Sequence, residues 1–422
     1  MSTIFALSSG APPAAIAVVR ISGANAALAL RQLAGRLPVP RRAVTATLRD
    51  DTGLDLDRAL VLWLPGPHTA TGEDCAELHL HGGRAVVAAV ERALLTIPGL
   101  RRAEPGEFTR RAFLNGKIDL AEAEGLADLL AAETEAQRRS ALAMAGGAFS
   151  RRVEDWRLRL LMLSAEVEAG LDFADDDDVA SADCSTWNIA PLRDELAGWL
   201  MRPRAEALRE GYRVVLAGPP NAGKSTLFNA LVEAEAAITS PLAGTTRDVV
   251  SRPVAIAGVP FLFLDTAGLR DDAPDLVERA GVTRARTELE RADCVLWLGA
   301  PGDGPAGAWQ IAAQCDRHDH NGVTARHRVS ALTGEGLDDL RADLVAAARQ
   351  ALPVPGEAAL SERQHRLVSD AERALARAVN MRDPLLVAEE LRLARVAFDS
   401  LLGRTTTEDM LDALFGRFCI GK

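Results

Sequence analysis

The segment from Gly218 to Ser225 has the strongest chemical signature in the sequence. It reads GPPNAGKS and matches the pattern G-x-x-x-x-G-K-[S/T], after an apolar run and before a stretch of helical character. In such a loop, backbone N–H groups surround phosphate oxygens at a helix N-terminus, the lysine reaches the β- and γ-phosphates, and the serine binds Mg²⁺. The segment therefore predicts a nucleotide site that uses Lys224 and Ser225, rather than a simple glycine turn.

Two later segments extend the predicted phosphate site. The run GTTRD at 244–248 supplies Thr246, which can complete the Mg²⁺ shell and sense the γ-phosphate. After the next apolar run, Asp265 can hold Mg²⁺ through water, and the N–H of Gly268 can bind the γ-phosphate. Leu269 stands where many GTPases carry a water-orienting glutamine, so hydrolysis needs help from another group.

A carboxylate is available to bind the base. The segment AQCD at 313–316 aligns best with the guanine-reading pattern N-K-x-D and keeps only Asp316, which can accept hydrogen bonds from guanine N1–H and N2–H₂. Ser330 and Ala331 begin a segment that resembles the loop beneath the base. We expect guanine selectivity, weakened by the two lost residues. The expected nucleotide contacts are Gly218, Asn221, Ala222, Gly223, Lys224, Ser225, Thr226, Ser240, Thr245, Thr246, Asp265, Thr266, Ala267, Gly268, Asp316, Ser330 and Ala331.

Short apolar strands must position this site. The runs 213–217, 261–265 and 294–298 lead into glycine-containing turns and alternate with helical stretches, which predicts a parallel α/β sheet. The link from Leu298 to Trp309 is only about ten residues long, which is short for a helical crossover between parallel strands. We therefore expect that helix to be missing or reduced.

Helical segments flank the predicted sheet. Residues 120–208 and 358–422 are rich in Ala, Leu, Glu and Arg, and we expect them to form one helical domain that contains the α/β domain as an insertion. A separate C-terminal domain is the alternative. The predicted division is an N-terminal α/β domain at 1–117, a first helical part at 118–209, a P-loop GTPase domain with a Ras-like parallel sheet at 210–350, and a second helical part at 351–422.

The composition excludes several classes of protein. The 422 residues include 48 Lys or Arg and 59 Asp or Glu, a net charge of −11, so any RNA contact must be local. No apolar run is long enough to span a membrane and the start lacks the basic region of a signal peptide, so we expect a cytoplasmic protein without a membrane partner. The only lysines are Lys117, Lys224 and Lys422, and we expect each position to need a compact ammonium.

Other chemically suggestive residues have simpler explanations. Four aspartates at 175–178 repel one another, and a solvated loop is a better interpretation than a metal site. His79 and His81 alternate on an expected strand without a visible third ligand. Cys419 has no nearby base and is not expected to be a catalytic thiol. The remaining cysteines are expected to be small buried apolar residues: Cys75, Cys184, Cys294 and Cys315.

Segments near both ends of the chain share one resemblance. They are VVRISG at 18–23, TGED at 71–74, PGEFTRRAFLNGK at 105–117 and FCIGK at 418–422, with the ordered GTPase motifs between them. Together they resemble the tRNA modification GTPase family MnmE, also called TrmE, over the whole chain. The resemblance implies a folate-binding and dimerising N-terminal domain, a discontinuous helical domain and a G domain.

The resemblance also implies a reaction and its partners. A homodimer, in a heterotetramer with the flavoprotein MnmG, would add an aminomethyl or carboxymethylaminomethyl group at C5 of the wobble uridine of certain tRNAs. The one-carbon donor would be a folate derivative, 5,10-methylene- or formyl-tetrahydrofolate. By position, the folate pocket would be lined by Arg20, Glu77, Lys117 and Lys422. Surface ion pairing of Arg20 with Glu77 is the alternative that the residues alone would favour.

The family offers a substitute for the missing glutamine. K⁺ would bridge the phosphates, held near Asn221, Ser240, Leu242 and Thr245. Glu278 would orient the attacking water, although an exposed helical glutamate is the plainer interpretation. The implied catalytic residues are then Glu278, Lys224 and Thr246, with Ser225 and Thr246 as the Mg²⁺ ligands.

Two other functions compete with this one. An Era-like ribosome-assembly GTPase would share the G motifs, but it predicts a basic RNA-binding domain that the net charge of −11 disfavours. A scaffold for MnmG that does not hydrolyse GTP would explain the eroded guanine motif. The presence of Lys224, Ser225, Thr246 and Asp265 argues against it.

Overall fold

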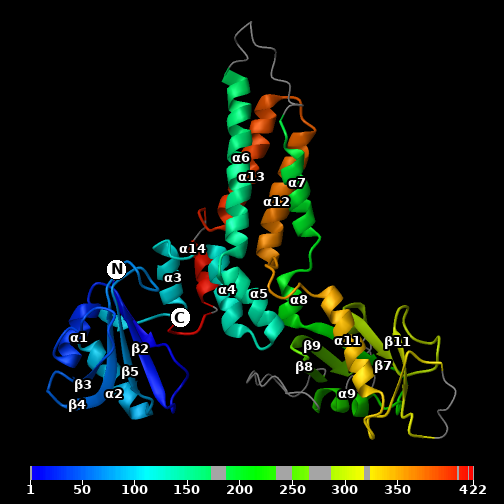
Figure 1. Cartoon of the computed structure of the whole chain (residues 1–422), viewed down its shortest axis with the longest axis horizontal. Coiled ribbons are helices and arrows are strands. Elements are labelled where there is room, and N and C mark those ends of the chain that lie inside the picture. The colour runs from blue at the N-terminus through cyan, green and yellow to red at the C-terminus, as the bar shows by residue number, and fades with distance from the viewer. Residues whose placement is uncertain are drawn as a thin grey trace, which may run out of the picture. The chain divides into compact units, whose positions relative to one another are not determined.

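The computed structural model describes residues 2–172, 187–233, 250–265, 287–317, 324–405, 408–416 and 418–421, shown in Figure 1. The chain divides into two compact units, one of Met1–Ala127 with Asp399–Lys422 and one of Asp128–Phe398. The predicted four-part division stays a prediction. Within the described ranges, no helix has the length and apolar character that crossing a bilayer requires.

The first unit contains a six-stranded sheet with the order β3-β4-β5-β2-β1-β6. All neighbours are antiparallel except β1 and β6, which are parallel. Two helices, α1 and α2, pack against one apolar cluster with these strands. The bounds are β1 (Thr3–Leu7), β2 (Ile16–Ser22), β3 (Val44–Arg49), β4 (Asp55–Leu64), β5 (Cys75–His81), β6 (Leu100–Arg102), α1 (Ala26–Ala34) and α2 (Arg84–Leu95).

Strand alternation decides which side chains of this sheet are available for chemistry. Val19 and Ile21 of β2 are fully buried, as is Leu78 of β5, because successive side chains of a strand point to opposite faces. Arg20 and Glu77 therefore share the opposite face, and the register pairs them directly.

A second cluster of the first unit joins residues that are nearly 300 positions apart. It includes Leu120 of α4 with Leu411 and Phe415 of α14. Arg110 of α3 forms an ion pair with Asp412 of α14, with a distance of 2.9 Å between Nη1 and Oδ1. The chain's final described residues continue along this unit, where the Ser8 hydroxyl donates to the Gly421 carbonyl at 2.8 Å. The bounds are α3 (Glu107–Leu114), α4 (Leu120–Ala131) and α14 (Glu408–Phe415).

The helices of the second unit pack around aromatic side chains. Trp156 is fully buried, and its ring lies 5.6 Å from that of Trp199 and 5.9 Å from that of Phe398 between centroids. Helices from both helical sequence segments pack together, because α7 contacts α12. The bounds are α5 (Glu135–Ala145), α6 (Ala148–Asp172), α7 (Ala190–Leu200), α8 (Ala205–Glu210), α12 (Glu362–Val379) and α13 (Pro384–Leu401).

The second sheet has the order β12-β11-β10-β7-β9-β8. Its strands are parallel except for the edge strand β8, which runs antiparallel to β9. Residues 298–308, between β10 and β11, form turns and no helix, which confirms the expected loss of a crossover helix. The bounds are β7 (Tyr212–Ala217), α9 (Lys224–Glu233), β8 (Val250–Ile256), β9 (Val259–Asp265), β10 (Cys294–Trp297), β11 (Trp309–Ala313), β12 (His327–Val329) and α11 (Leu337–Ala351).

Candidate nucleotide-binding site

The loop between β7 and α9 has a backbone that requires glycine at two positions. Gly218 has a φ of 149°, and a Cβ there would lie 3.1 Å from the carbonyl carbon of Leu298. Gly223 has a φ of 90°, and a Cβ there would lie 3.1 Å from the amide nitrogen of Gln314. A glycine loop that opens a helix is the arrangement in which backbone N–H groups bind phosphate.

Lys224 lies inside this loop. Its side chain is only 7% exposed, and Nζ donates hydrogen bonds to the carbonyls of Gly218 at 3.0 Å and Pro219 at 2.8 Å. Phosphate oxygens are charged acceptors and bind an ammonium more strongly than neutral carbonyls do. The ammonium is therefore held where it can contact a phosphate group that enters the loop.

Ser225 and Asp265 bring two oxygen groups together beside the loop. The Ser225 hydroxyl donates to Oδ2 of Asp265 at 2.6 Å, and Asp265 is only 5% exposed. Asp265 reaches this position because β9 pairs with β7 in parallel and places the carboxylate opposite Leu216. A hydroxyl next to a carboxylate is a donor set that suits Mg²⁺, which prefers oxygen ligands.

The predicted base contacts follow two neighbouring parallel strands. Asp316 comes after β11, and Ser330 and Ala331 come after β12, so the paired strands bring them to one edge of the sheet. The N–H of Cys315 donates to the carbonyl of Val329 at 3.2 Å and joins the two loops. Asp316 is exposed, whereas Ser330 is fully buried.

Gln314 is a contact of the phosphate loop that the sequence analysis did not assign. It has a φ of 60°, and its side chain lies against Gly223 of the loop. The available signal was its position in the AQCD segment, directly after Ala313. Gln314 therefore brings the AQCD segment into contact with the phosphate loop.

The described residues include only part of the expected site. Asn221 and Ala222 lie in the loop, and Thr226 lies in the first turn of α9. Asn221 has a φ of 61°, a left-handed conformation that asparagine tolerates better than most residues do. The expected residues outside the described ranges are Ser240, Leu242, Thr245, Thr246, Thr266, Ala267, Gly268, Leu269, Glu278 and Lys422, together with the aspartates at 175–178 and Cys184.

The first unit brings together two of the residues expected to bind folate. Arg20 donates from Nε and Nη2 to Oε1 of Glu77 at 3.1 and 3.0 Å, and the side chains are 26% and 19% exposed. His79 lies 3.2 Å from the other carboxylate oxygen of Glu77. Lys117 is exposed and lies against Gly72, where an added Cβ would be 2.9 Å from its Cε.

No function was predicted from the sequence for a buried network of ion pairs near Lys117. Arg111 is 4% exposed and forms ion pairs with Glu73 and Glu107, each at 2.9 Å. Burial disfavours the Glu107 carboxylate, but hydrogen bonds from Arg101, a backbone N–H and Arg111 lower its pKa. The sequence did contain a signal for this network, because Glu73 belongs to the TGED segment and Glu107 and Arg111 belong to the PGEFTRR segment.

The cysteines differ in burial. Cys75 and Cys294 are buried as expected, and burial raises the pKa of the Cys294 thiol to about 12. Cys315 is only partly buried, so the expectation for it was wrong, because it lies in the turn after β11. Cys419 is exposed.

Matches to known protein families cover nearly the whole chain. Residues 3–117 match the model described as GTP-binding protein TrmE N-terminus, and residues 120–419 match the MnmE helical domain. The chain belongs to the MnmE family. The tRNA modification GTPase MnmE of Novosphingobium aromaticivorans is 62% identical over 100% of this chain and 99% of its own length. The protein of the same name from Erythrobacter litoralis is 62% identical over 100% of both chains.

Two solved structures resemble part of this MnmE-family chain. Era from Aquifex aeolicus, in a structure with GDP and AlF4−, is 24% identical and covers 42% of this chain and 69% of its own, with a TM-score of 0.25. The G domain of the FeoB iron transporter of T. maritima is 23% identical and covers 32% of this chain and 98% of its own, with a TM-score of 0.23. TM-scores this low support no inference about function.

Replacing Asp265 by alanine should lower Mg²⁺-dependent GTP turnover by about 10²-fold, because the carboxylate beside Ser225 is lost. Initial rates over a series of Mg²⁺ concentrations measure the effect. Asp303→Ala is the matched control, because Asp303 is exposed and lies in the turn region between β10 and β11. An unchanged rate and Mg²⁺ requirement in Asp265→Ala would refute the role of this carboxylate.

Proposed function

We propose that this chain hydrolyses GTP as part of tRNA modification. The observation that carries the proposal is the contact of 2.6 Å between the Ser225 hydroxyl and Asp265, beside the buried ammonium of Lys224. The name of the curated relatives, tRNA modification GTPase MnmE, supports the same activity over the full chain. The full-length match also favours this function over the Era-like alternative.

The proposed site divides its tasks among a few residues. Lys224 binds the β- and γ-phosphates, and the loop backbone holds the same phosphates through its N–H groups. Ser225 and Thr246 are the proposed Mg²⁺ ligands, and Asp265 acts through water. When bound, Mg²⁺ neutralises charge that develops on the phosphate oxygens. Asp316 selects guanine, with Ser330 and Ala331 next to the base.

A monovalent cation and a glutamate complete the proposed hydrolytic site. K⁺ would be held by Asn221, Ser240, Leu242 and Thr245, and Glu278 would orient water for attack on the γ-phosphate. The left-handed backbone of Asn221 supports a specialised loop at this point. The absence of a glutamine at Leu269 makes such help necessary.

The proposed modification reaction uses the first unit. A folate derivative, 5,10-methylene- or formyl-tetrahydrofolate, would bind near Arg20, Glu77, Lys117 and Lys422. Arg20 and Glu77 pair with each other, as the alternative of a surface ion pair expects. The folate role rests on the family match, and the chemistry suits it, because a pterin offers amide and amine edges to a carboxylate and the folate tail offers carboxylates to cations. The product would be an aminomethyl or carboxymethylaminomethyl group at C5 of the wobble uridine, made by a homodimer together with MnmG.

GTP turnover should be faster in K⁺ than in Na⁺ by roughly tenfold or more, because a correctly placed positive charge stabilises phosphoryl transfer. Turnover of GTP and of ATP, each measured in K⁺ and in Na⁺, separates the alternatives. Absence of hydrolysis in K⁺ would contradict the proposed activity and favour a scaffold. Equal use of ATP and GTP would show that Asp316 alone does not select guanine.

Mass analysis of wobble uridine in tRNA from cells that lack this protein tests the modification itself. The modified nucleoside should disappear and should return when the protein is supplied again. An unchanged nucleoside profile would contradict the proposed role in tRNA modification.

A further inference from the structure

A groove in the second unit gathers arginine side chains. It has a volume of about 590 Å³, and its lining includes Arg204, Arg363, Arg366 and Arg373, with Glu362 as the one carboxylate. Arg204 comes directly before α8, and the other residues belong to α12. Four guanidinium groups outnumber the carboxylates of Glu362, Glu206 and Asp370, so the groove is locally positive in a chain whose net charge is −11.

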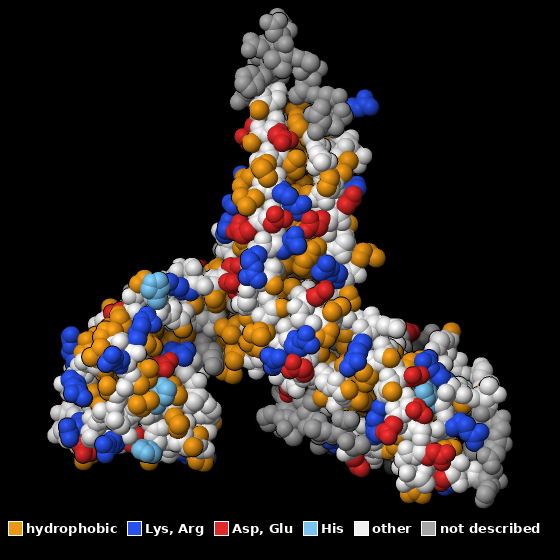
Figure 2. Space-filling view, viewed as in Figure 1, with side chains coloured by type: hydrophobic (Ala, Val, Ile, Leu, Met, Phe, Trp, Pro, Cys, Tyr) orange, Lys and Arg blue, Asp and Glu red, His pale blue; other side chains and the backbone are white. Residues whose placement is uncertain are grey.

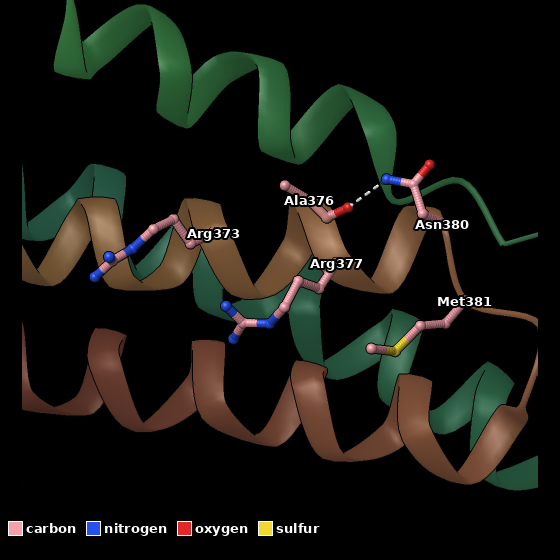
Figure 3. Close-up of a pocket in the computed structure, with 5 residues that line it drawn as sticks. All are labelled: Arg373, Ala376, Arg377, Asn380 and Met381. Carbon is pink, nitrogen blue, oxygen red and sulfur yellow. Dashed lines mark hydrogen bonds between the residues drawn. The ribbon is translucent and has the colours of Figure 1, made fainter.

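The basic surface continues along α12. A neighbouring hollow of about 510 Å³ is lined by Arg373 and Arg377, with Ala376, Asn380 and Met381 (Figure 3). Arg366, Arg373 and Arg377 are seven and four residues apart, so they share one face of the helix. The span from Arg363 to Arg377 is about 21 Å at the rise of an α-helix.

The other face of α12 fixes this orientation. Val368, Leu375 and Ala378 are buried in the second unit, so the arginine face must point outward. Two hydrogen bonds join the segment after Arg204 to the start of α12. The N–H of Ala205 donates to the Leu360 carbonyl at 2.9 Å, and the N–H of Glu362 donates to Oε1 of Glu206 at 2.8 Å.

The arginines differ in how far carboxylates neutralise them. Arg373 forms an ion pair with Asp370, and Arg377 forms one with Glu390 at 2.7 Å. Within the described part of the chain, no carboxylate pairs with Arg204 or Arg366, and both are exposed. Figure 2 shows basic and acidic side chains mixed over the face in view.

We propose that this arginine groove binds the phosphate backbone of the tRNA. A guanidinium presents two parallel N–H donors that match two phosphate oxygens, and phosphate contacts position a nucleic acid without reading its bases. The lining contains no Phe, Tyr or Trp side chain and His365 is its one ring, so arginines outnumber groups that could stack on unpaired bases. The inference rests on the proposed function, because that function supplies tRNA as the partner.

The test removes the two arginines that lack an ion pair. In the full-length Arg204→Ala/Arg366→Ala variant, the plot of log affinity for unmodified tRNA against log KCl concentration should become shallower by about 1.4 to 1.8. Fluorescence anisotropy with labelled tRNA measures both slope and affinity. The charge-matched control is Arg349→Ala/Arg395→Ala, because both residues are exposed and lie outside the groove.

For the control variant, the slope of log affinity for tRNA against log KCl concentration should nearly equal that of the wild-type protein. An equal loss in both variants would overturn the proposal by showing an effect of net charge alone. Unchanged binding in the groove variant would also overturn it and would leave an acidic protein surface as the occupant. GTP turnover without tRNA, together with thermal unfolding, checks that the variants are folded. Absence of GTP turnover in the wild-type protein would contradict the proposed function. The tRNA titration would still show whether the arginine groove binds tRNA.

Discussion

Replacing Lys224 by arginine should lower GTP turnover by about 10²- to 10³-fold, nearly as much as replacing it by alanine. Lys224 is only 7% exposed, and its Nζ donates to carbonyls at 3.0 and 2.8 Å. A guanidinium is larger and planar, so it cannot occupy this space without moving the loop. Steady-state turnover and nucleotide binding by both variants measure the loss.

The control for this substitution is Arg349→Lys on the exposed side of α11. This control replaces an arginine by a lysine, the reverse of the exchange at Lys224, and should leave GTP turnover unchanged. If Lys224→Arg kept half of the original turnover, any cation would suffice in the loop. That outcome would contradict the requirement for a compact ammonium.

Replacing Trp156 by alanine should destabilise the second unit by about 3 to 5 kcal/mol. The side chain is fully buried, and its ring contacts Phe149, Trp199 and Phe398. The substitution removes these contacts and also the hydrogen bond of 2.7 Å from Nε1 to Glu195. Hydrogen exchange in α6 and α7 reports the stability of this part of the chain directly.

Trp156→Phe separates packing from hydrogen bonding. It keeps an aromatic ring and loses the Nε1–H donor, so it should cost about 1 to 3 kcal/mol. Urea unfolding followed by far-UV circular dichroism compares the two variants. A loss below about 1 kcal/mol for Trp156→Ala would show that this aromatic cluster is not a core.

The strands beside the phosphate loop could be predicted closely from the sequence. The expected run 213–217 corresponds to β7 (Tyr212–Ala217), and 294–298 corresponds to β10 (Cys294–Trp297). Both are short apolar runs that lead into turns, because a central parallel strand is buried on both faces. The phosphate loop was also predictable, since its chemistry depends on residues that are adjacent in sequence.

The antiparallel edge strand could not be predicted with the same reasoning. Ala257 and Gly258 form the two-residue connection between β8 and β9 with φ values of 49° and 76°. Two positive φ values make a hairpin turn, but its usual signal is Asn-Gly or Asp-Gly. Pro253 also weakens the strand pattern, and it is tolerated because β8 lies at the sheet edge.

Contacts between residues that depend on strand register were harder to predict than the strands themselves. Arg20 and Glu77 are 57 residues apart, and only the pairing of β2 with β5 places them opposite each other. The arginine groove likewise needs Arg204 beside the start of α12, which is more than 150 residues later. Such juxtapositions follow from tertiary packing, because local periodicity gives only the face on which a residue lies.

The discontinuous first unit has a consequence for the order in which the protein folds during synthesis. Leu120 leaves the ribosome long before Leu411, Phe415 and Phe418, the residues that complete its apolar cluster. Domains generally fold as they emerge, so the second unit can acquire its core while this cluster is still open. Newly made chains would therefore carry an exposed apolar surface near α4 until the last stage of translation, when chaperone protection matters most.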